Sequence, residues 1–208
     1  MALVKLNNRG VRSATTFGSI SALGSITFIK KLTASSSATL SFVDGSSSVV
    51  LDNTYKEYLF TFKDIHPATN DTIFTFQTDT GTNTSYNQTM TTTFFQTRHT
   101  EDDTTQSGAV TYSTNRDQGQ ATGFQKLNYD TGNGNDESVS GILRLFDPSN
   151  TTFVKHFISR ASNYGQSDES ADCFVAGYVN TTTALTSVQF KFASGNMDTG
   201  TIKMYGVV

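Results

Sequence analysis

Alternating apolar and polar positions recur along most of the chain and predict β-strands. In residues 55–65 (YKEYLFTFKDI), Tyr58, Phe60 and Phe62 occupy every second position, with mostly polar side chains between them. A two-residue period places successive side chains on opposite faces of a sheet, as in a half-buried strand. Proline lacks a backbone donor, so we expect this strand to end at His66–Pro67.

The same pattern recurs along the chain, and turn-forming sequences such as VDGSSS, HPATND, DTGNGND and SGNMDTG separate its repeats. No segment has a convincing helical period. Residues 99–138 are the least strand-like, and we expect them to form long surface loops with one short helix near residues 117–126. The other predicted strands are residues 26–32, 38–43, 48–51, 72–78, 89–97, 139–146, 152–159, 172–179, 185–193 and 200–207.

Many of these strands carry Phe or Val on their faces, and two sheets are needed to bury such faces against each other. We therefore predict an all-β fold: a single antiparallel β-sandwich of jelly-roll type over residues 25–208. Gly10, Gly18 and Gly24 indicate that residues 1–24 form an extended N-terminal arm. No linker divides the remainder.

Composition supports a folded chain with a polar surface. The 208 residues are 36% hydrophobic and 16% charged, a balance seen in disordered chains, yet the sequence contains 16 Phe and 8 Tyr. Disordered chains are poor in aromatic residues. Thr is a good strand former and leaves a sheet polar without adding charge.

Charge is distributed unevenly along the chain. The first 43 residues contain Lys5, Arg9, Arg12, Lys30 and Lys31 and no acidic residue, whereas the remainder has ten Lys or Arg and 18 Asp or Glu, a net charge of −8. This asymmetry favours docking of the N-terminal arm on a negatively charged partner. The alternative is an ordinary number of cations with unusually few acids. An acidic body repels phosphate, so we expect no nucleic-acid partner.

Cysteine usage and hydrophobic segments narrow the class of protein further. Cys173 is the only cysteine, so no intramolecular disulfide forms, and its apolar neighbours indicate a small buried side chain rather than a catalytic thiol. The first ten residues, MALVKLNNRG, lack the apolar core of a signal peptide, and no stretch is long enough to span a membrane. We expect a protein made in a cytoplasm and not inserted in a membrane.

No motif for catalysis, a cofactor or a metal is apparent. His66, His99 and His156 have no metal-binding spacing, and G-x-S-x-G, P-loop, CxxC and H-E-x-x-H motifs are missing from the sequence. We expect His66 to bond backbone where its strand ends. His156 alternates with Val154 and Ile158, and we expect it on a buried strand face or in a cross-strand pair. A glycan-active enzyme is the least supported alternative.

Residues 130–137 (DTGNGNDE) alternate oxygen-bearing side chains with glycines. Calcium takes oxygen ligands, but the spacing of an EF-hand loop is missing, and such tracts are usually hairpin turns. We expect a surface loop in which Asp130, Asn133, Asn135 and Asp136 are available for recognition. Bound calcium is the less favoured alternative.

Four stretches together resemble a known family: GSISALGSITFIKKLTASSSATLSF, LDNTYKEYLFTFKDIHPATN, SNTTFVKHFIS and SGNMDTGTIKMYGVV. They are similar to small virion structural proteins, of the tail-fibre or head-decoration type, of marine tailed bacteriophages such as cyanophages. The resemblance covers most of the chain and is weakest over residues 99–138. It implies synthesis in the host cytoplasm, a place on the virion, and major capsid or tail proteins as partners. It carries over no catalytic residue.

Within this class, the short chain without coiled-coil or repeat spacers favours a non-enzymatic capsid decoration or knob protein. The alternative is a tail or tail-fibre component that binds a host surface glycan. Virion appendages are commonly symmetric, so we expect a homo-oligomer, with a trimer favoured. The Thr89, Thr91 and Thr93 side chains are candidates for contacts between its subunits.

The N-terminal arm is the predicted anchor to the virion. Its apolar side chains supply most of the expected hold, at about 1.5–3 kcal/mol for each large side chain that becomes fully covered. Its cations add an attraction that salt screens. The anchoring residues are Leu3, Lys5, Arg9, Arg12 and Phe17.

Overall fold

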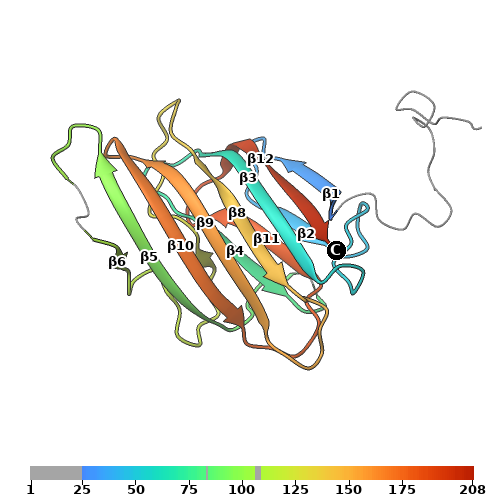
Figure 1. Cartoon of the computed structure of the whole chain (residues 1–208). Helices are drawn as coiled ribbons and strands as arrows, with labels where there is room; N and C mark the ends of the chain where they lie inside the picture. Colours follow the sequence, from blue (N-terminus) through green and yellow to red (C-terminus); the bar gives the residue numbers. More distant parts are fainter. Residues whose placement is uncertain (1–24, 83, 106–108) are drawn as a thin grey trace, which may run out of the picture.

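The described part of the chain forms two antiparallel β-sheets that face each other (Figure 1). The computed structural model describes residues 25–82, 84–105 and 109–208, and these contain no helix. No helix long and apolar enough to cross a membrane is therefore found in these ranges. The predicted all-β sandwich is confirmed. Its jelly-roll character stays a prediction, and the N-terminal arm lies outside the described residues.

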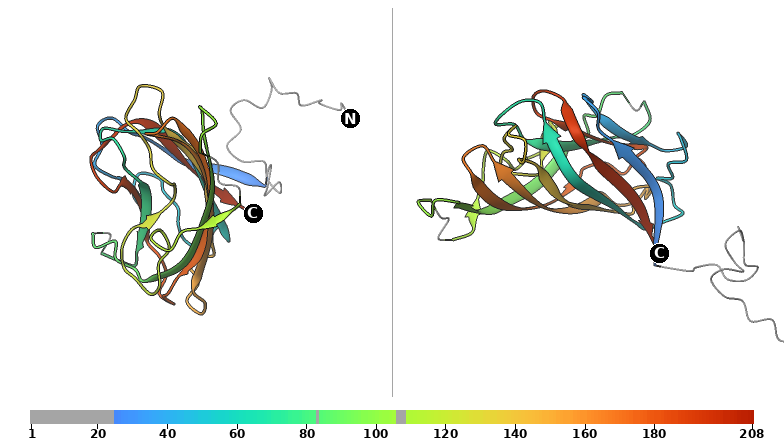
Figure 2. Two further views of the ribbon diagram at one scale, coloured as in Figure 1. Left: turned by 90° about the vertical axis from the view of Figure 1, so that its left-hand side faces the viewer. Right: turned by 90° about the horizontal axis from the view of Figure 1, so that it is seen from above.

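Eight strands form the larger sheet, in the order β1-β12-β3-β8-β9-β10-β5-β6, and four form the smaller sheet, in the order β2-β11-β4-β7. The strands are β1 (Ile26–Thr33), β2 (Leu40–Val43), β3 (Glu57–Pro67), β4 (Phe74–Asp79), β5 (Met90–Thr100), β6 (Thr111–Tyr112), β7 (Gln125–Lys126), β8 (Val139–Phe146), β9 (Lys155–Gly165), β10 (Glu169–Val179), β11 (Ser187–Phe192) and β12 (Met197–Val207). Figure 2 shows the two sheets as the two layers of a sandwich.

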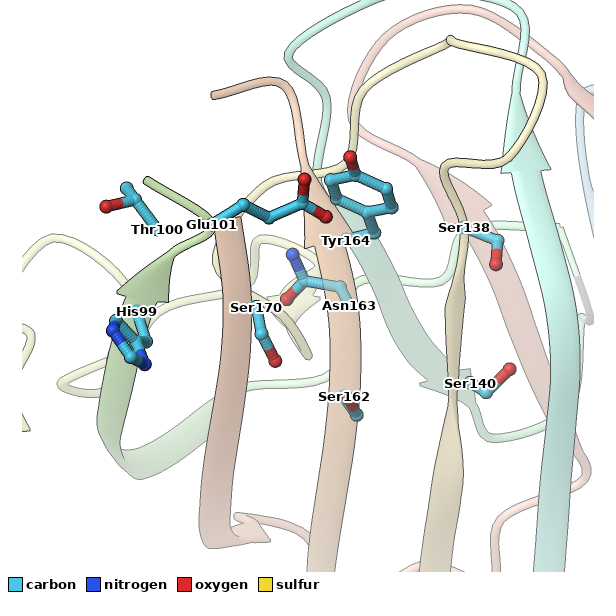
Figure 3. A pocket seen from close by; sticks show the side chains of 9 residues that line it. All are labelled: His99, Thr100, Glu101, Ser138, Ser140, Ser162, Asn163, Tyr164 and Ser170. Atoms are coloured by element: carbon cyan, nitrogen blue, oxygen red, sulfur yellow. The ribbon is translucent and has the colours of Figure 1, made fainter. Parts of the chain in front are cut away.

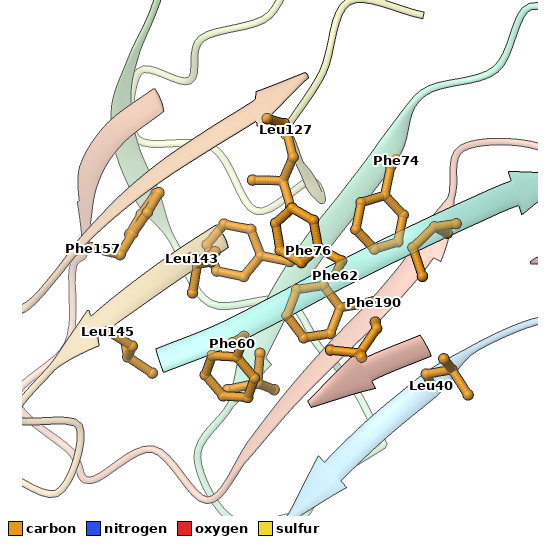
Figure 4. Packing of buried hydrophobic residues seen from close by; sticks show 14 of the residues in the cluster. Leu40, Phe60, Phe62, Phe74, Phe76, Leu127, Leu143, Leu145, Phe157 and Phe190 are labelled. Carbon is orange, nitrogen blue, oxygen red and sulfur yellow. The ribbon is translucent and has the colours of Figure 1, made fainter. Parts of the chain in front are cut away.

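Aromatic side chains from both sheets fill the space between the layers (Figure 4). Phe60 and Phe62 of β3 point into this space, as the alternation predicted, and are at most 2% exposed. Phe74 and Phe190 of the smaller sheet stack with ring centroids 5.7 Å apart, and Phe62 meets Phe74 edge-on at 5.3 Å. Offset and edge-on ring pairs of this kind add to the stability that burial alone gives.

Two predicted elements are wrong. Residues 48–51 are not a strand, although Val49 and Leu51 are buried. Asp44 instead accepts a hydrogen bond from the Leu51 amide at 2.8 Å and fixes a turn there. Residues 117–126 form no helix, because their backbone pairs with β5: the Ala121 and Met90 amides each donate to the other's carbonyl.

The middle of the chain also differs from the expected surface loops. Residues 111–112 and 125–126 add the short strands β6 and β7, one to each sheet. Leu127 is fully buried, and Asn128 donates to the Asp130 carbonyl and to Thr131 from the interior. Residues 125–131 therefore close one side of the sandwich, whereas residues 101–105 and 109–112 are exposed as predicted.

Candidate interaction surface

The outward face of the eight-stranded sheet is the candidate functional surface. Along β9, the inward side chains Phe157 and Ser159 alternate with the exposed side chains His156, Ile158 and Arg160. Strand alternation of this kind gives one covered and one open face. Among the described residues, five of the eight exposed large apolar side chains are in strands of this sheet: Ile26, Phe28, Tyr112, Ile142 and Ile158.

Strand register arranges the outward side chains of β8 and β9 into a compact group. Arg144 lies opposite Ile158, and Ile142 lies opposite Arg160, so apolar and cationic side chains alternate in both directions. Ile142 is 38% exposed and Ile158 is 52% exposed. Directly opposed side chains of neighbouring strands lie in contact range. The arrangement therefore offers apolar contact area and positive charge together.

An aromatic row continues across the next strands. Phe174 of β10 stacks on Phe95 of β5 with ring centroids 5.1 Å apart, and Phe95 is the register partner of Tyr112 in β6. The Arg160 guanidinium lies 4.7 Å from the Phe174 ring centroid and is also hydrogen-bonded to Asp172. A cation held over a ring and bonded to a carboxylate at the same time has little freedom. This part of the surface is preorganised.

Two shallow depressions lie on this face near Phe146 and His156, at the start of β9. One, of about 430 Å³, is lined by Thr91, Thr93, His156 and Tyr178 among others. The second, of about 490 Å³, shares the His156 and Phe146 side chains with the first. His156 and Tyr178 are cross-strand partners whose rings meet edge-on at 6.0 Å.

The part of the face near the other end of β9, around Tyr164, is rich in hydroxyl groups (Figure 3). A depression of about 550 Å³ is lined there by Ser140, Ser162, Ser170 and Tyr164, among others. Figure 3 shows the Glu101 carboxylate beside the Tyr164 ring. Burial and the nearby negative charges of Asp168 and Glu101 raise the pKa of Tyr164 to about 12.

The face is basic, although the molecule is acidic. In the ion pair of Arg144 with Glu57 the arginine is 45% exposed and the glutamate 21%, and in the pair of Arg160 with Asp172 the values are 61% and 33%. Each pair therefore presents its cation to solvent more than its anion. Cations outnumber anions among the charged side chains that point outward where the strands from β1 to β10 pair regularly. These side chains include Lys31, Lys63, Arg144, Arg160, Lys203, Glu57 and Asp172.

The predicted recognition loop is only partly on the surface. Asn133, Asn135 and Asp136 are exposed, but Asp130 is 7% exposed, so its expected place on the surface is wrong. Backbone hydrogen bonds between Thr72 and Thr131 hold the start of this loop against the segment that precedes β4. No group of three or more His, Cys, Asp or Glu side chains suited to a metal occurs among the described residues.

Asp130 lies near a group of charged side chains that includes Glu169, Arg98 and Arg116. The Tyr129 ring lies between the Arg98 and Arg116 guanidinium groups, each 4.2 Å from its centroid. Arg98 also pairs with the buried Glu169 at 3.1 Å. Burial, followed by the negative charge of Glu169, raises the pKa of Asp130 to about 6.

The histidines and the cysteine have structural surroundings. His66 bonds backbone as predicted, with its Nδ1 atom 2.6 Å from the Glu137 carbonyl. The cross-strand role of His156 is confirmed, but the buried face expected for it is wrong: it is exposed, and Lys155 points inward instead. Cys173 is fully buried, and burial raises its pKa to about 12, so the thiol is not activated as a nucleophile.

The predicted anchoring residues Leu3, Lys5, Arg9, Arg12 and Phe17 lie outside the described residues. The structure brings together residues that the sequence analysis did not select as a site, above all Ile142, Arg144, Ile158 and Arg160. The available signal was the alternation within residues 139–146 and 152–159. It shows that some side chains face outward, but the pairing of the two strands is needed to place them side by side.

A comparison of the chain with protein-family models, with curated proteins and with solved structures finds no match. Function is therefore inferred from the surface described above and from the motifs in the sequence.

Proposed function

We propose that the protein is a non-enzymatic structural protein of a bacteriophage virion. Within that class we favour a capsid decoration or knob protein on the particle surface. The observation that carries the proposal is the outward face of the eight-stranded sheet, where the exposed Ile142 and Ile158 side chains alternate with Arg144 and Arg160, beside the half-buried stacked pair of Phe95 and Phe174. Exposed apolar and aromatic side chains together with arginine are typical of a protein–protein contact.

The rigidity of the face supports an assembly role. Its strands are paired along most of their lengths, and β9 and β10 are in register over eleven residue pairs. A surface held by a sheet of eight strands changes little on binding, which lowers the entropic cost of forming a contact. The resemblance to phage virion proteins points to the same class.

The N-terminal arm completes the proposal as the anchor. The described part of the chain begins at Ser25, whose carbonyl accepts a hydrogen bond from the Val208 amide beside the edge strand β1. An arm that leaves from a sheet edge can reach a neighbouring virion protein without crossing the sandwich. The partner expected for it is the major capsid protein or a tail protein.

Particle composition and labelling test this proposal. Phage particles carrying a tagged copy of the protein would be purified by density gradient, analysed by mass spectrometry and labelled with gold against the tag. We expect the protein at high copy number, with label on the head surface. Absence from purified particles would overturn the proposal, and label confined to the tail would replace decoration with the tail role.

A second candidate function is binding of a host surface glycan by a tail component. The depression lined by Ser140, Ser162, Ser170 and Tyr164 favours it, because hydroxyl groups are suitable partners for the hydroxyls of a sugar. An array of bacterial surface polysaccharides probed with the purified protein tests this candidate. Binding that Ser162→Leu abolishes and Thr27→Leu, a control on β1, retains would support it, and no binding on the array would remove it.

A further inference from the structure

We propose that copies of this chain associate head to tail, with an acidic edge of one copy docked on a basic patch of the next. The basic patch consists of Ile142, Arg144, Ile158 and Arg160 on the outward face of β8 and β9. The acidic edge consists of Glu101, Asp102, Asp103, Val110 and Tyr112 beside the free edge of the same sheet. The inference concerns contacts between copies and does not depend on the virion role.

The basic patch is built to receive a partner. Its two isoleucines alternate with its two arginines, and all four side chains are exposed. The Arg144 and Arg160 ion pairs with Glu57 and Asp172 hold the guanidinium groups in place while leaving them the more exposed partners. Interfaces favour arginine with apolar side chains, because the guanidinium combines charge with flat contact area.

The acidic edge has the complementary character. Val110 is 61% exposed and Tyr112 is 50% exposed, and the Tyr112 hydroxyl donates to Asp117 at 2.6 Å. Glu101, Asp102 and Asp103 form an exposed turn directly after β5. The Glu101 amide donates to the Asp168 carbonyl at 2.8 Å, which ties this turn to the one between β9 and β10. Apolar side chains and carboxylates therefore follow one another along the same edge of the sheet, with Tyr112 opposite Phe95 and the carboxylates after the end of β5 at Thr100.

The two surfaces cannot meet within one molecule. They belong to one sheet, in which β10 and β5 separate β9 from β6. Strands are about 4.8 Å apart, so β9 and β6 are about 14 Å apart and present their side chains side by side. Contact between the basic patch and the acidic edge therefore requires a second copy.

Charge selects this pairing over two alternatives. A two-fold dimer that joined basic patch to basic patch would bring four arginines together, offset only by their less exposed partners Glu57 and Asp172, and like charges across an interface are unfavourable. The N-terminal arm carries Lys5, Arg9 and Arg12, the same sign as the patch, so it is poorly suited to cover it. A head-to-tail contact joins different surfaces and closes into a ring when its rotation permits. A ring of three is the size expected from the sequence.

Native mass spectrometry and light scattering of the full chain at about 10 μM test the proposal. We expect a closed oligomer whose affinity falls as salt rises. Three variants should each weaken association at least tenfold: Arg144→Glu with Arg160→Glu, Glu101→Lys with Asp102→Lys, and Ile158→Lys. Phe153→Ser is the matched control, since Phe153 is 69% exposed but lies outside both surfaces.

A variant in which the charges of both surfaces are reversed distinguishes this contact from other contacts between copies. A single chain that carries both charge reversals has a basic edge and an acidic patch, and it should regain the oligomer. Circular dichroism and thermal melting would first establish that each variant is folded. If the arginine variant fails to fold, Ile158→Lys and the edge reversal still decide the result. A monomeric wild-type protein at 100 μM, or oligomers that persist in both the edge reversal and Ile158→Lys, would overturn the proposal.

Discussion

Two buried carboxylates, Asp130 and Asp79, have pKa values shifted in opposite directions, because hydrogen bonds outweigh burial at Asp79 and not at Asp130. Asp130 is buried near Glu169 and Asp71, with Arg116 and Arg98 as the opposing positive charges, and its pKa rises to about 6. Its Oδ1 atom is buried without a hydrogen-bond partner among the described residues. A carboxyl group whose pKa is raised by folding is protonated more readily in the folded state than in the unfolded state. It therefore lowers stability progressively as the pH rises from the unfolded pKa of 3.8 to the folded pKa of about 6, and the loss is constant above that.

Asp130→Asn should stabilise the protein at neutral pH. The free energy of unfolding of the variant, relative to wild type, should increase from pH 4 to about pH 6 and stay constant above pH 7. The gain should be about 1–2 kcal/mol, less than the full pKa shift implies because solvent screens part of the charge. Urea denaturation between pH 4 and pH 8 measures it. A difference independent of pH would mean that Asp130 has an ordinary pKa.

Asp79 lies at the end of β4 and organises the turn that follows. Its carboxylate accepts hydrogen bonds from the Thr80 amide at 2.6 Å, from the Thr84 amide at 2.9 Å and from the Ser85 amide at 3.0 Å. Burial raises its pKa, but these bonds favour the charged form more strongly, so the net pKa is lowered. Its contribution to stability is present above pH 4 and is lost as the pH falls through the folded pKa.

Asp79→Asn should therefore destabilise the protein at neutral pH by about 1.5–3 kcal/mol, the usual range for hydrogen bonds to a charged group. The difference from wild type should shrink as the pH falls below 4, because both side chains are then neutral. Thermal melting at pH 7 and pH 3 measures the two limits. Asp198→Asn is a suitable control, and equal destabilisation at both pH values would contradict the assignment.

At the scale of elements, β12 lies between the edge strand β1 and β3, and its pairing with β3 is irregular. The register between the two strands shifts at Thr199–Thr201. Gly200 has a φ of 117°, and a Cβ atom there would lie 2.6 Å from the Asp64 carbonyl. Asp64 itself has a φ of 50°. Only glycine combines this backbone conformation with so close an approach of the opposite strand.

Gly200→Ala should lower the free energy of unfolding by about 1–3 kcal/mol through backbone strain and the clash with β3. Gly119→Ala is the matched control, since a Cβ atom at Gly119 meets nothing within 4 Å. Urea denaturation of both variants measures the difference. Equal stability of the two would show that the bulge relaxes without cost.

How far the sequence predicts these elements depends on what fixes each one. Residues 139–146 are a strand with the predicted bounds, because regular alternation is a local property. Alternation does not reveal which face is buried, and Lys155 takes an inward position by donating to the Phe153 and Thr181 carbonyls. The group of Ile142 and Arg160 depends on the register in which β8 pairs with β9. The sequence of either strand alone does not specify this register.

At the scale of the whole molecule, the sandwich and the N-terminal arm are expected to be separable. The described residues from Ser25 onward contain a large hydrophobic core, and β12 is paired on both sides. Deleting residues 1–16 should leave a folded, soluble protein that melts within a few degrees of wild type and fails to join phage particles. Circular dichroism and the copy number of the variant in particles measure the two outcomes.

Replacing Lys5, Arg9 and Arg12 by Ser is the companion variant. It removes the charge of the arm but keeps its apolar side chains, so it should weaken incorporation mainly at low salt, where the attraction of the wild-type arm is not screened. Unfolding of the truncated protein would place the arm in the core. Incorporation of the truncated protein at normal copy number would place the anchor elsewhere.

The central claim is that the outward face of the eight-stranded sheet is an assembly surface on a virion. A cryo-electron microscopy map of the intact particle tests it most directly, because the sandwich can be fitted and its neighbours identified. We expect copies of the sandwich on the particle surface, with Ile142, Ile158 and the adjacent arginines covered by a neighbouring subunit. A map that contains the sandwich with this face open to solvent in every copy, or that contains no such density, would contradict the claim.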